Sequence, residues 1–192
     1  HLLTGIKSPT FQNQLAKITN HRSGEIKFGE KILTVPKDTN IIEFMSSCDA
    51  KFVLFGIPED IGIRANLGRP GAASAYDSAL KNLVNIQHNK FCKGSNLLVL
   101  GHLDCSEEMN AAKDLDPKNK EQRKELFDLV EKIDIEVSHI VHQIVKAGKI
   151  PIIIGGGHNN AYGNIKGLAL AKGKPVNAIN FDAHTDFRTM EG

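Results

Sequence analysis

The sequence predicts an α/β fold in which a mostly parallel sheet is covered by helices on both faces. Short apolar runs alternate along the chain with longer segments of helical periodicity. The runs are apolar throughout, which is typical of parallel strands buried on both faces, whereas half-exposed strands alternate between apolar and polar residues. No linker and no internal repeat divides the chain, so we expect a single domain over residues 1–192.

Four short apolar runs are the expected strands. Each has the length of a strand rather than of a helix and is bounded by polar residues, Gly or Pro. The third run ends at a cluster of glycines and the fourth at a carboxylate. The four expected strands occupy residues 51–57, 96–101, 151–155 and 176–181.

Three segments between these runs have the spacing of helices. The clearest is 120–147, where Leu126, Ile133 and Ile140 belong to one apolar stripe and charged residues occupy the opposite face. Gly148 follows as a suitable C-terminal stop. The other two expected helices occupy residues 72–86 and 160–171.

The two ends of the chain suggest that it is a fragment of a longer protein. It begins at His1 without Met and stops soon after its richest motif, where no helix or strand pattern closes it. Residues 1–50 form a poorly defined N-terminal segment, with only the surroundings of Phe44 suggesting a short helix. We therefore expect one incomplete domain with its α/β core at 51–192 and its C-terminal part missing.

Composition excludes several classes of protein. The net charge is only +2 and no basic stripe is interleaved with aromatic residues, so nucleic acid is not an expected partner. No apolar run approaches the roughly 20 residues that span a bilayer. The 3 cysteines lack Cys-x-x-Cys spacing, which argues against a disulfide framework and a structural zinc site. We expect a protein of the reducing cytoplasm without a membrane partner.

The first motif that carries chemistry is the glycine-rich run before His158. Gly155, Gly156 and Gly157 follow the third expected strand and let the backbone turn sharply beside the imidazole. A phosphate-binding loop is the alternative, but the run lacks the Gly-Lys-Ser/Thr ending and the Gly-x-Gly-x-x-Gly spacing of nucleotide sites. Taken alone, His158 suits a structural role as well as metal binding.

The second motif is Asp182-Ala183-His184-Thr185-Asp186, directly after the fourth expected strand. Two carboxylates and an imidazole occupy alternate positions, and alternate side chains of an extended chain share a face. Mixed nitrogen and oxygen ligands suit Mn²⁺, Fe²⁺ or Zn²⁺. A solvated turn with a chance histidine is the alternative, yet carboxylates directly after an apolar strand need partners.

The two motifs end consecutive expected strands that are joined by a helix. Ligands of open α/β sheets bind beyond the carboxyl ends of the strands. His158 is therefore expected beside Asp182, His184 and Asp186. These residues are half of the set that a metal pair needs, because two fully coordinated ions usually require more carboxylates.

The two motifs together resemble the ureohydrolase family, which includes arginase, agmatinase and formimidoylglutamase. The resemblance rests on residues 155–158 and 180–186 and covers roughly 51–192. It extends to 68–72, Gly-Arg-Pro-Gly-Ala, which is similar to a loop that the family carries after its first strand. The resemblance implies a three-layer α/β/α fold, two Mn²⁺ ions bridged by a hydroxide, a small amidine or guanidine substrate, and homo-oligomers.

Matching positions carry the family's roles over to single residues. The resemblance implies that His158 ligates one ion and His184 the other, that Asp182 bridges both, and that Asp186 binds the same ion as His158. His184 and Asp186 are also implied as catalytic residues, with Asp186 carrying a proton to the leaving amine. The family's remaining carboxylates come from a Ser-x-Asp-x-Asp motif that lies beyond this chain.

A polar loop after the first expected strand is a candidate for substrate binding. Arginine offers bidentate hydrogen bonds to a carboxylate. Loop structure is the alternative, with Arg69 bracing the turn before Pro70. Together with one residue after the glycine-rich motif, the candidate substrate-binding residues are Arg64, Asn66, Arg69 and Asn160.

The resemblance favours formimidoylglutamase-like members within the family. Gly157 stands where arginases and agmatinases usually have Asp, and Phe187-Arg188 indicates the same subgroup, although Asn159 departs from the Glu of many members. The expected reaction converts formiminoglutamate to glutamate and formamide. Release of urea from arginine or agmatine is the alternative, and a non-catalytic metal-binding relative is an alternative of another class.

Overall fold

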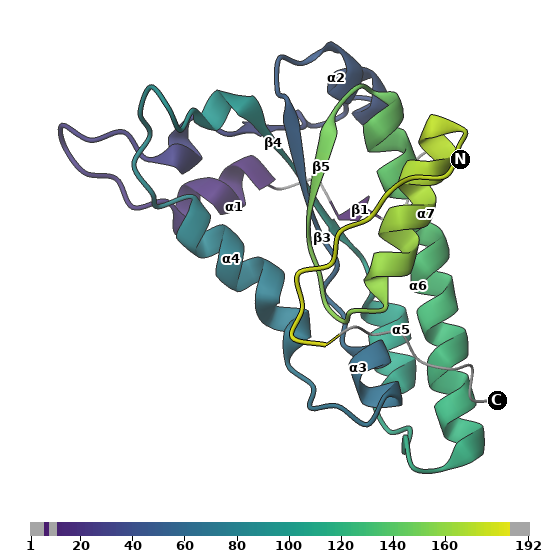
Figure 1. The fold of residues 1–192 in the computed structure, drawn as a ribbon. Coiled ribbons are helices and arrows are strands. Elements are labelled where there is room, and N and C mark those ends of the chain that lie inside the picture. Colours follow the sequence, from purple (N-terminus) through teal and green to yellow (C-terminus); the bar gives the residue numbers. More distant parts are fainter. Residues whose placement is uncertain (1–5, 8–10, 185–192) are drawn as a thin grey trace.

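The computed structural model describes residues 6–7 and 11–184 of the chain, and a five-stranded sheet forms its centre (Figure 1). The strand order is β1-β4-β3-β5, and β2 also pairs with β4. Only β1 is antiparallel to its neighbour, so the predicted α/β fold with a mostly parallel sheet is confirmed. The strands are β1 (Ile6–Lys7), β2 (Leu33–Thr34), β3 (Phe52–Gly56), β4 (Leu97–Leu103) and β5 (Ile150–Ile154).

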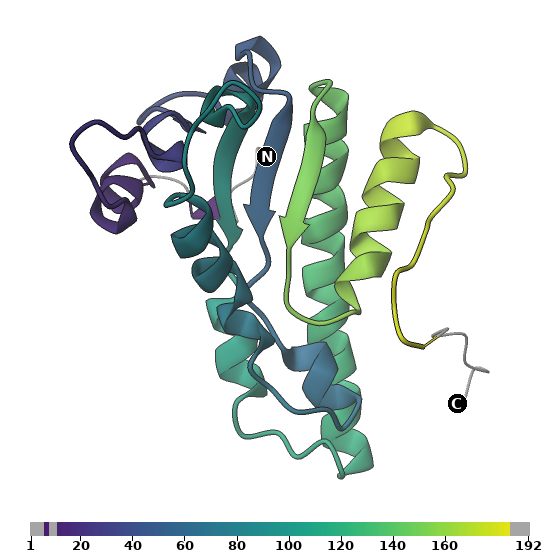
Figure 2. The same cartoon turned by 60° about the vertical axis from the view of Figure 1, so that its left-hand side comes forward.

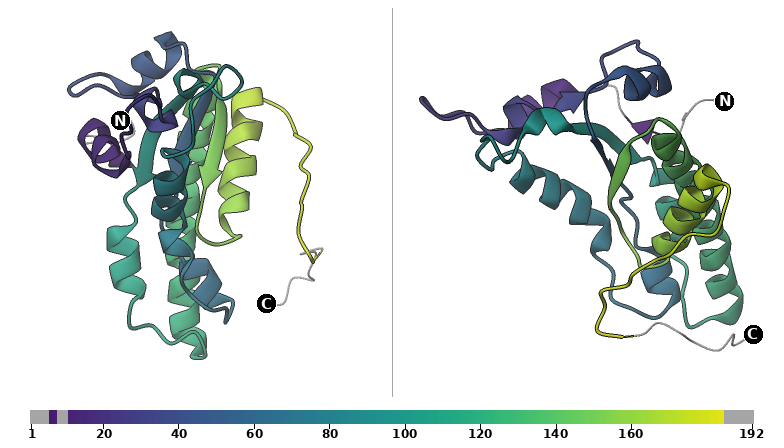
Figure 3. Two further views of the ribbon diagram at one scale, coloured as in Figure 1. Left: turned by 90° about the vertical axis from the view of Figure 1, so that its left-hand side faces the viewer. Right: turned by 45° about the horizontal axis from the view of Figure 1, so that its top comes forward.

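Helices lie on both faces of this sheet. The left panel of Figure 3 shows the strands between α1 on one side and α7 on the other. The helices are α1 (Phe11–Ile18), α2 (Ile41–Ser47), α3 (Ile61–Ala65), α4 (Ala75–Leu83), α5 (Ser106–Ala112), α6 (Lys120–Lys146) and α7 (Asn160–Lys172). Short 3₁₀ turns occupy Phe28–Glu30, Ala72–Ser74 and Gly94–Asn96.

Successive residues of a strand pack into two separate hydrophobic cores, one on each face of the sheet. Val53 and Phe55 of β3 pack into the core beneath α6, whereas Leu54 between them packs into the core that α4 covers. Successive side chains of a strand point to opposite faces, so a strand needs apolar residues at every position when both faces are covered. This explains why β3 and β4 appear in the sequence as continuous apolar runs.

The long helix α6 confirms the predicted stripe of 120–147. Leu126, Ile133 and Ile140 are almost fully buried. The Asn119 side chain accepts hydrogen bonds from the amides of Glu121 and Gln122 and so caps the first turn. No helix in the described part of the chain is both long and apolar enough to cross a bilayer.

Glycines bring α7 unusually close to α6. A Cβ atom at Gly167 would press on the Ser138 carbonyl oxygen and the Val141 side chain of α6, and one at Gly163 would press on Asp134 and Val137. Small residues let two helix backbones approach closely, and no other residue type leaves this space. The packing matters for function because α7 begins directly after His158.

The N-terminal segment contains more structure than its sequence indicated. The expected short helix around Phe44 is α2, and Met45 within it is fully buried. The two-residue strands β1 and β2 were not predicted, because two residues carry no periodicity, and the eight-residue helix α1 was not predicted either. Their positions depend on contacts with distant elements, such as the pairing of β2 with β4.

The fourth expected strand, at residues 176–181, is wrong. The segment is an irregular chain that runs beside α7 (Figure 2), and Ile179 and Phe181 are 82% and 95% exposed. A strand needs a hydrogen-bonded neighbour as well as suitable residues, since an apolar run by itself satisfies none of its backbone groups. Among the described residues, no segment pairs with this one.

Replacing Gly167 by Ala tests the close packing of α7 on α6. Alanine is the better helix former, yet its methyl group would meet the Ser138 carbonyl. We expect the free energy of unfolding, measured by urea denaturation, to fall by about 1–3 kcal/mol. Leu170→Ala, at a 57% exposed position of the same helix, should change it by less than about 0.5 kcal/mol. A more stable G167A variant would contradict the packing argument.

Candidate metal centre

His158 lies in the loop that joins β5 to α7, beyond the carboxyl end of β5. The parallel register places this end beside the end of β3, because Gly56 pairs with Ile154. The His158 side chain is 56% exposed, so solvent reaches its ring. The histidine therefore stands at the edge of the sheet where α/β proteins bind ligands.

Asp182 lies between two imidazoles. Its Oδ2 atom is 3.7 Å from Nδ1 of His158, and its Oδ1 atom is 3.5 Å from Nδ1 of His184. Each carboxylate oxygen thus faces a different histidine. The structure brings together three of the four predicted metal ligands, and the fourth, Asp186, lies outside the described residues.

The surroundings of Asp182 favour its charged form. The backbone amide of His184 donates a 2.9 Å hydrogen bond to Oδ1 and lowers the carboxyl pKa below its ordinary value. Slight burial raises the pKa in opposition, and positive charge on His158 or His184 lowers it further. A carboxylate that is ionised at neutral pH is the form that coordinates a cation.

The described donors form two pairs that share one carboxylate. In the part of the chain that the structure describes, no three His, Cys, Asp or Glu side chains surround one point. The contacts are instead two separate pairs, His158 with Asp182 and His184 with Asp182. A carboxylate can bridge two cations through its two oxygens, and imidazole with carboxylate is a donor set that divalent transition metals accept.

Glu59 lies beneath the histidine loop and was not predicted from the sequence. Its side chain is fully buried and accepts four hydrogen bonds. A signal was available, because Glu59 follows an apolar strand and Pro58, and charges at a strand end need partners. The need of a carboxylate for partners after an apolar run supported a functional role for Asp182, and it holds equally for Glu59.

The candidate substrate-binding residues lie in different surroundings. The Arg64 guanidinium donates to three carbonyl oxygens at the end of α5, those of Ala112, Lys113 and Leu115. These bonds favour the alternative of a role in loop structure. Asn160 is buried and donates to Glu59, whereas Asn66 and Arg69 are exposed in the loop after α3.

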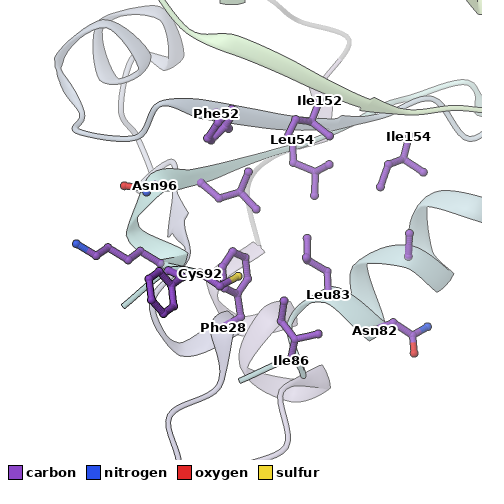
Figure 4. A pocket seen from close by; sticks show the side chains of 14 residues that line it. Phe28, Phe52, Leu54, Asn82, Leu83, Ile86, Cys92, Asn96, Ile152 and Ile154 are labelled. Atoms are coloured by element: carbon purple, nitrogen blue, oxygen red, sulfur yellow. The ribbon is translucent and has the colours of Figure 1, made fainter. Parts of the chain in front are cut away.

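Two hollows differ sharply in their chemistry. A hollow of about 420 Å³ is lined by the glycine-rich loop, His158, Asn160 and Asn180. A larger cavity, of about 570 Å³, lies elsewhere, between α4 and the sheet (Figure 4). Leu54 of β3 and Ile154 of β5 point into it, and its described lining contains no carboxylate or imidazole. The predicted metal ligand His158 thus lines the smaller, more polar hollow and not the larger apolar cavity.

A comparison with family models assigns the chain to a known family. The model of the arginase family matches residues 50–192. The chain belongs to the arginase family. The match confirms the resemblance seen in the sequence, and it covers both histidine motifs.

Curated relatives of this arginase-family chain are named formimidoylglutamase. The protein of Chromobacterium violaceum is 32% identical over 136 residues, which are 70% of this chain and 37% of the relative. The protein of Salmonella arizonae is 33% identical over 144 residues, 73% and 38% of the two chains. The protein of Geobacillus sp. is 30% identical over 154 residues, 79% and 41%. The chain thus spans about two fifths of the length of these relatives.

A second buried carboxylate of this arginase-family chain, Asp134 of α6, has an unusual titration. It is 9% exposed, and within the described residues its Oδ1 atom has no hydrogen-bond partner. Burial raises its pKa to about 6, the charge of Glu59 adds to the rise, and Lys166 opposes it. Between about pH 4 and pH 6 the Asp134 carboxyl is therefore protonated in the folded chain and ionised in the unfolded chain, where its pKa is ordinary.

Asp134→Asn tests this titration through stability. Because the folded-state pKa is raised, the contribution of Asp134 is fully present below about pH 4 and is lost as pH rises through about 6. The stability of the variant relative to the wild type should therefore grow by about 1–3 kcal/mol between pH 4 and pH 7. Urea unfolding of both proteins across this range measures the difference. Parallel pH profiles would exclude the raised pKa.

Proposed function

We propose that the protein is a manganese-dependent hydrolase of linear amidine or guanidine C–N bonds. The observation that carries the proposal is the Asp182 carboxylate, whose two oxygens face His158 and His184. Two imidazoles that each face a different oxygen of one carboxylate are suited to a pair of cations that share a ligand. Membership of the arginase family supports the same reaction class.

The residues have distinct roles in this proposal. His158 and His184 would each hold one Mn²⁺, Asp182 would be shared between the two ions, and Asp186 would join His158 on its ion. When bound, the metal pair supplies a hydroxide nucleophile near neutral pH, because divalent cations lower the pKa of a coordinated water. His158 and Asp182 are open to solvent on one side, which leaves room for a small substrate beside them.

The reaction needs one C–O bond to form and one C–N bond to break. Attack at the planar imino carbon gives a tetrahedral species, which expels the substrate's amine nitrogen. That nitrogen leaves as a neutral amine only if it gains a proton, and we assign this transfer to Asp186, with His184 as the second catalytic residue. With formiminoglutamate the products are glutamate and formamide.

Formiminoglutamate is the first choice of substrate. The relatives described above are named formimidoylglutamase, and the resemblance to this subgroup includes Gly157, which stands where arginases and agmatinases usually have Asp. Of the candidate substrate-binding residues, Arg69 is the arginine that is exposed in the loop after α3, and Asn66 lies in the same loop. We propose these two as contacts for the substrate's carboxylates.

Replacing Asp182 by Ala tests the metal assignment. The intact protein should lose both ions and all turnover, because no other described carboxylate faces both histidines. Mn²⁺ stoichiometry can be followed by electron paramagnetic resonance during titration. Asp128→Ala removes an exposed carboxylate of α6 that pairs only with Lys124 among the described residues, and should leave two ions bound. Retention of two tight ions in D182A would refute the ligand assignment.

Product analysis tests the substrate. We expect the intact protein with Mn²⁺ to release formamide and glutamate from formiminoglutamate, and no urea from arginine or agmatine. Quantifying formamide and urea in parallel reactions at equal substrate concentration separates the subgroups. Urea release would move the protein to the arginase or agmatinase type. Binding of one weak ion without any hydrolysis would instead indicate a non-catalytic relative.

A further inference from the structure

We propose that Glu59 is a positioning residue for the metal centre, holding the glycine-rich loop so that His158 faces Asp182. The proposal rests on the metal-binding role of His158 proposed above. Glu59 does not touch the centre itself. It acts through the loop that carries His158, at the place where the loops after β3 and β5 contact each other.

The contacts of the Glu59 carboxylate divide between two loops. Its Oε2 atom accepts a 2.7 Å hydrogen bond from the amide of Ile61, at the start of α3. Its Oε1 atom accepts bonds from the Gly157 amide at 3.0 Å, Asn160 Nδ2 at 2.8 Å and Asn159 Nδ2 at 3.3 Å. One carboxylate thus joins segments that are about a hundred positions apart in the sequence.

The three bonds to Oε1 come from residues on either side of His158 in the sequence. Gly157 immediately precedes the histidine, and Asn159 and Asn160 immediately follow it. The imidazole is 56% exposed, so packing restricts it little and its direction depends on the backbone that carries it. Glu59 holds the Gly157 amide before the histidine and the Asn159 and Asn160 side chains after it. By these bonds a buried carboxylate can orient an exposed ring.

The loop and the Glu59 segment are in direct backbone contact. A Cβ atom at Gly156 would overlap the carbonyl oxygen of Glu59, so only glycine fits at this position. A backbone atom cannot move aside as the end of a side chain can. The contact therefore limits how closely the loop can approach the Glu59 segment, and the three hydrogen bonds from Gly157, Asn159 and Asn160 hold the loop in place.

A carboxylate suits this position better than an amide. All four partners of Glu59 are N–H donors, and an ionised carboxylate offers only acceptors. A glutamine would turn its own NH₂ group toward at least one of these donors. Across the described residues Glu59 has no ion pair, so hydrogen bonds alone compensate the burial of its charge, and each of them carries weight.

Capping of α3 is the competing explanation, and a neighbour provides the control. Asp60 is also buried, at 6% exposure, and its carboxylate accepts a 2.8 Å bond from the Gly71 amide. It braces the loop after α3, and within the described part of the chain its side chain makes no hydrogen bond to residues 157–160. Asp60→Asn therefore removes a comparable buried charge from the adjacent position without releasing the histidine loop.

The experiment compares Mn²⁺ binding by the intact wild-type protein and four variants: E59Q, D60N, H158A and the double variant E59Q/H158A. Electron paramagnetic resonance titration gives the number of ions and the affinity of each. In E59Q we expect one ion to bind 10–100-fold more weakly, a range typical for loss of a residue that orients a ligand. The other ion should bind within about threefold of wild type, since E59Q leaves its ligands in place.

The double variant separates positioning from other effects. If Glu59 acts through His158, E59Q has nothing left to disturb in the H158A background, so H158A and E59Q/H158A should bind the remaining ion equally. A further loss in the double variant would show that the missing charge or a global distortion weakens binding, and would overturn the proposal. Equal loss in D60N and E59Q would overturn it too.

Two further results keep the proposal separate from the proposed function. If wild type binds two ions and E59Q binds both unchanged, the positioning role is wrong and the metal centre stands. If wild type binds no pair of ions, the proposed function fails, and the positioning role fails with it. Should E59Q not fold, Asn160→Ala removes the 2.8 Å bond and keeps the carboxylate; unchanged binding in that variant would overturn the proposal.

Discussion

The parallel pairing of β5 with β3 is the constraint on which the rest of the site depends. It sets Gly56 opposite Ile154, and the amide of Ile57 extends the ladder by a hydrogen bond to the Ile154 carbonyl. The segments that follow β3 and β5 therefore leave the sheet at the same edge and in the same direction. Without this register the loop after β3 could not lie under the loop that carries His158.

Much of this arrangement could be predicted because burial on two faces leaves a clear pattern. The strands β3 and β4 are continuous apolar runs that are buried on both faces, and α6 carries an apolar stripe. The strand β5 is also apolar throughout, although Ile150 and Ile152 are 46% and 41% exposed. The histidine motifs were found because their residue types are unusual at strand ends. Elements such as β2 could not be found, since two residues carry no periodicity and β2 exists only through its pairing with β4.

The proximity of His158 and Asp182 was expected for a reason that the structure does not support. The sequence suggested two adjacent strands, whereas 176–181 is an irregular segment that returns beside α7. Apolar composition alone could not distinguish these paths, because it reports which residues avoid water and not which backbone groups find partners. Glu59 was missed for a related reason, as its partners lie in a loop that sequence order does not place beside it.

The large sequence separation between Glu59 and its partners in the histidine loop also affects when these contacts form during folding. Contacts between residues far apart in sequence form late, because closing the intervening chain costs entropy before any contact offsets it. Gly157 and Glu59 are 98 positions apart, with α4, β4, α5 and α6 between them. The bonds from the histidine loop to Glu59 require that β5 has already paired with β3, so we expect them to form among the later steps of folding.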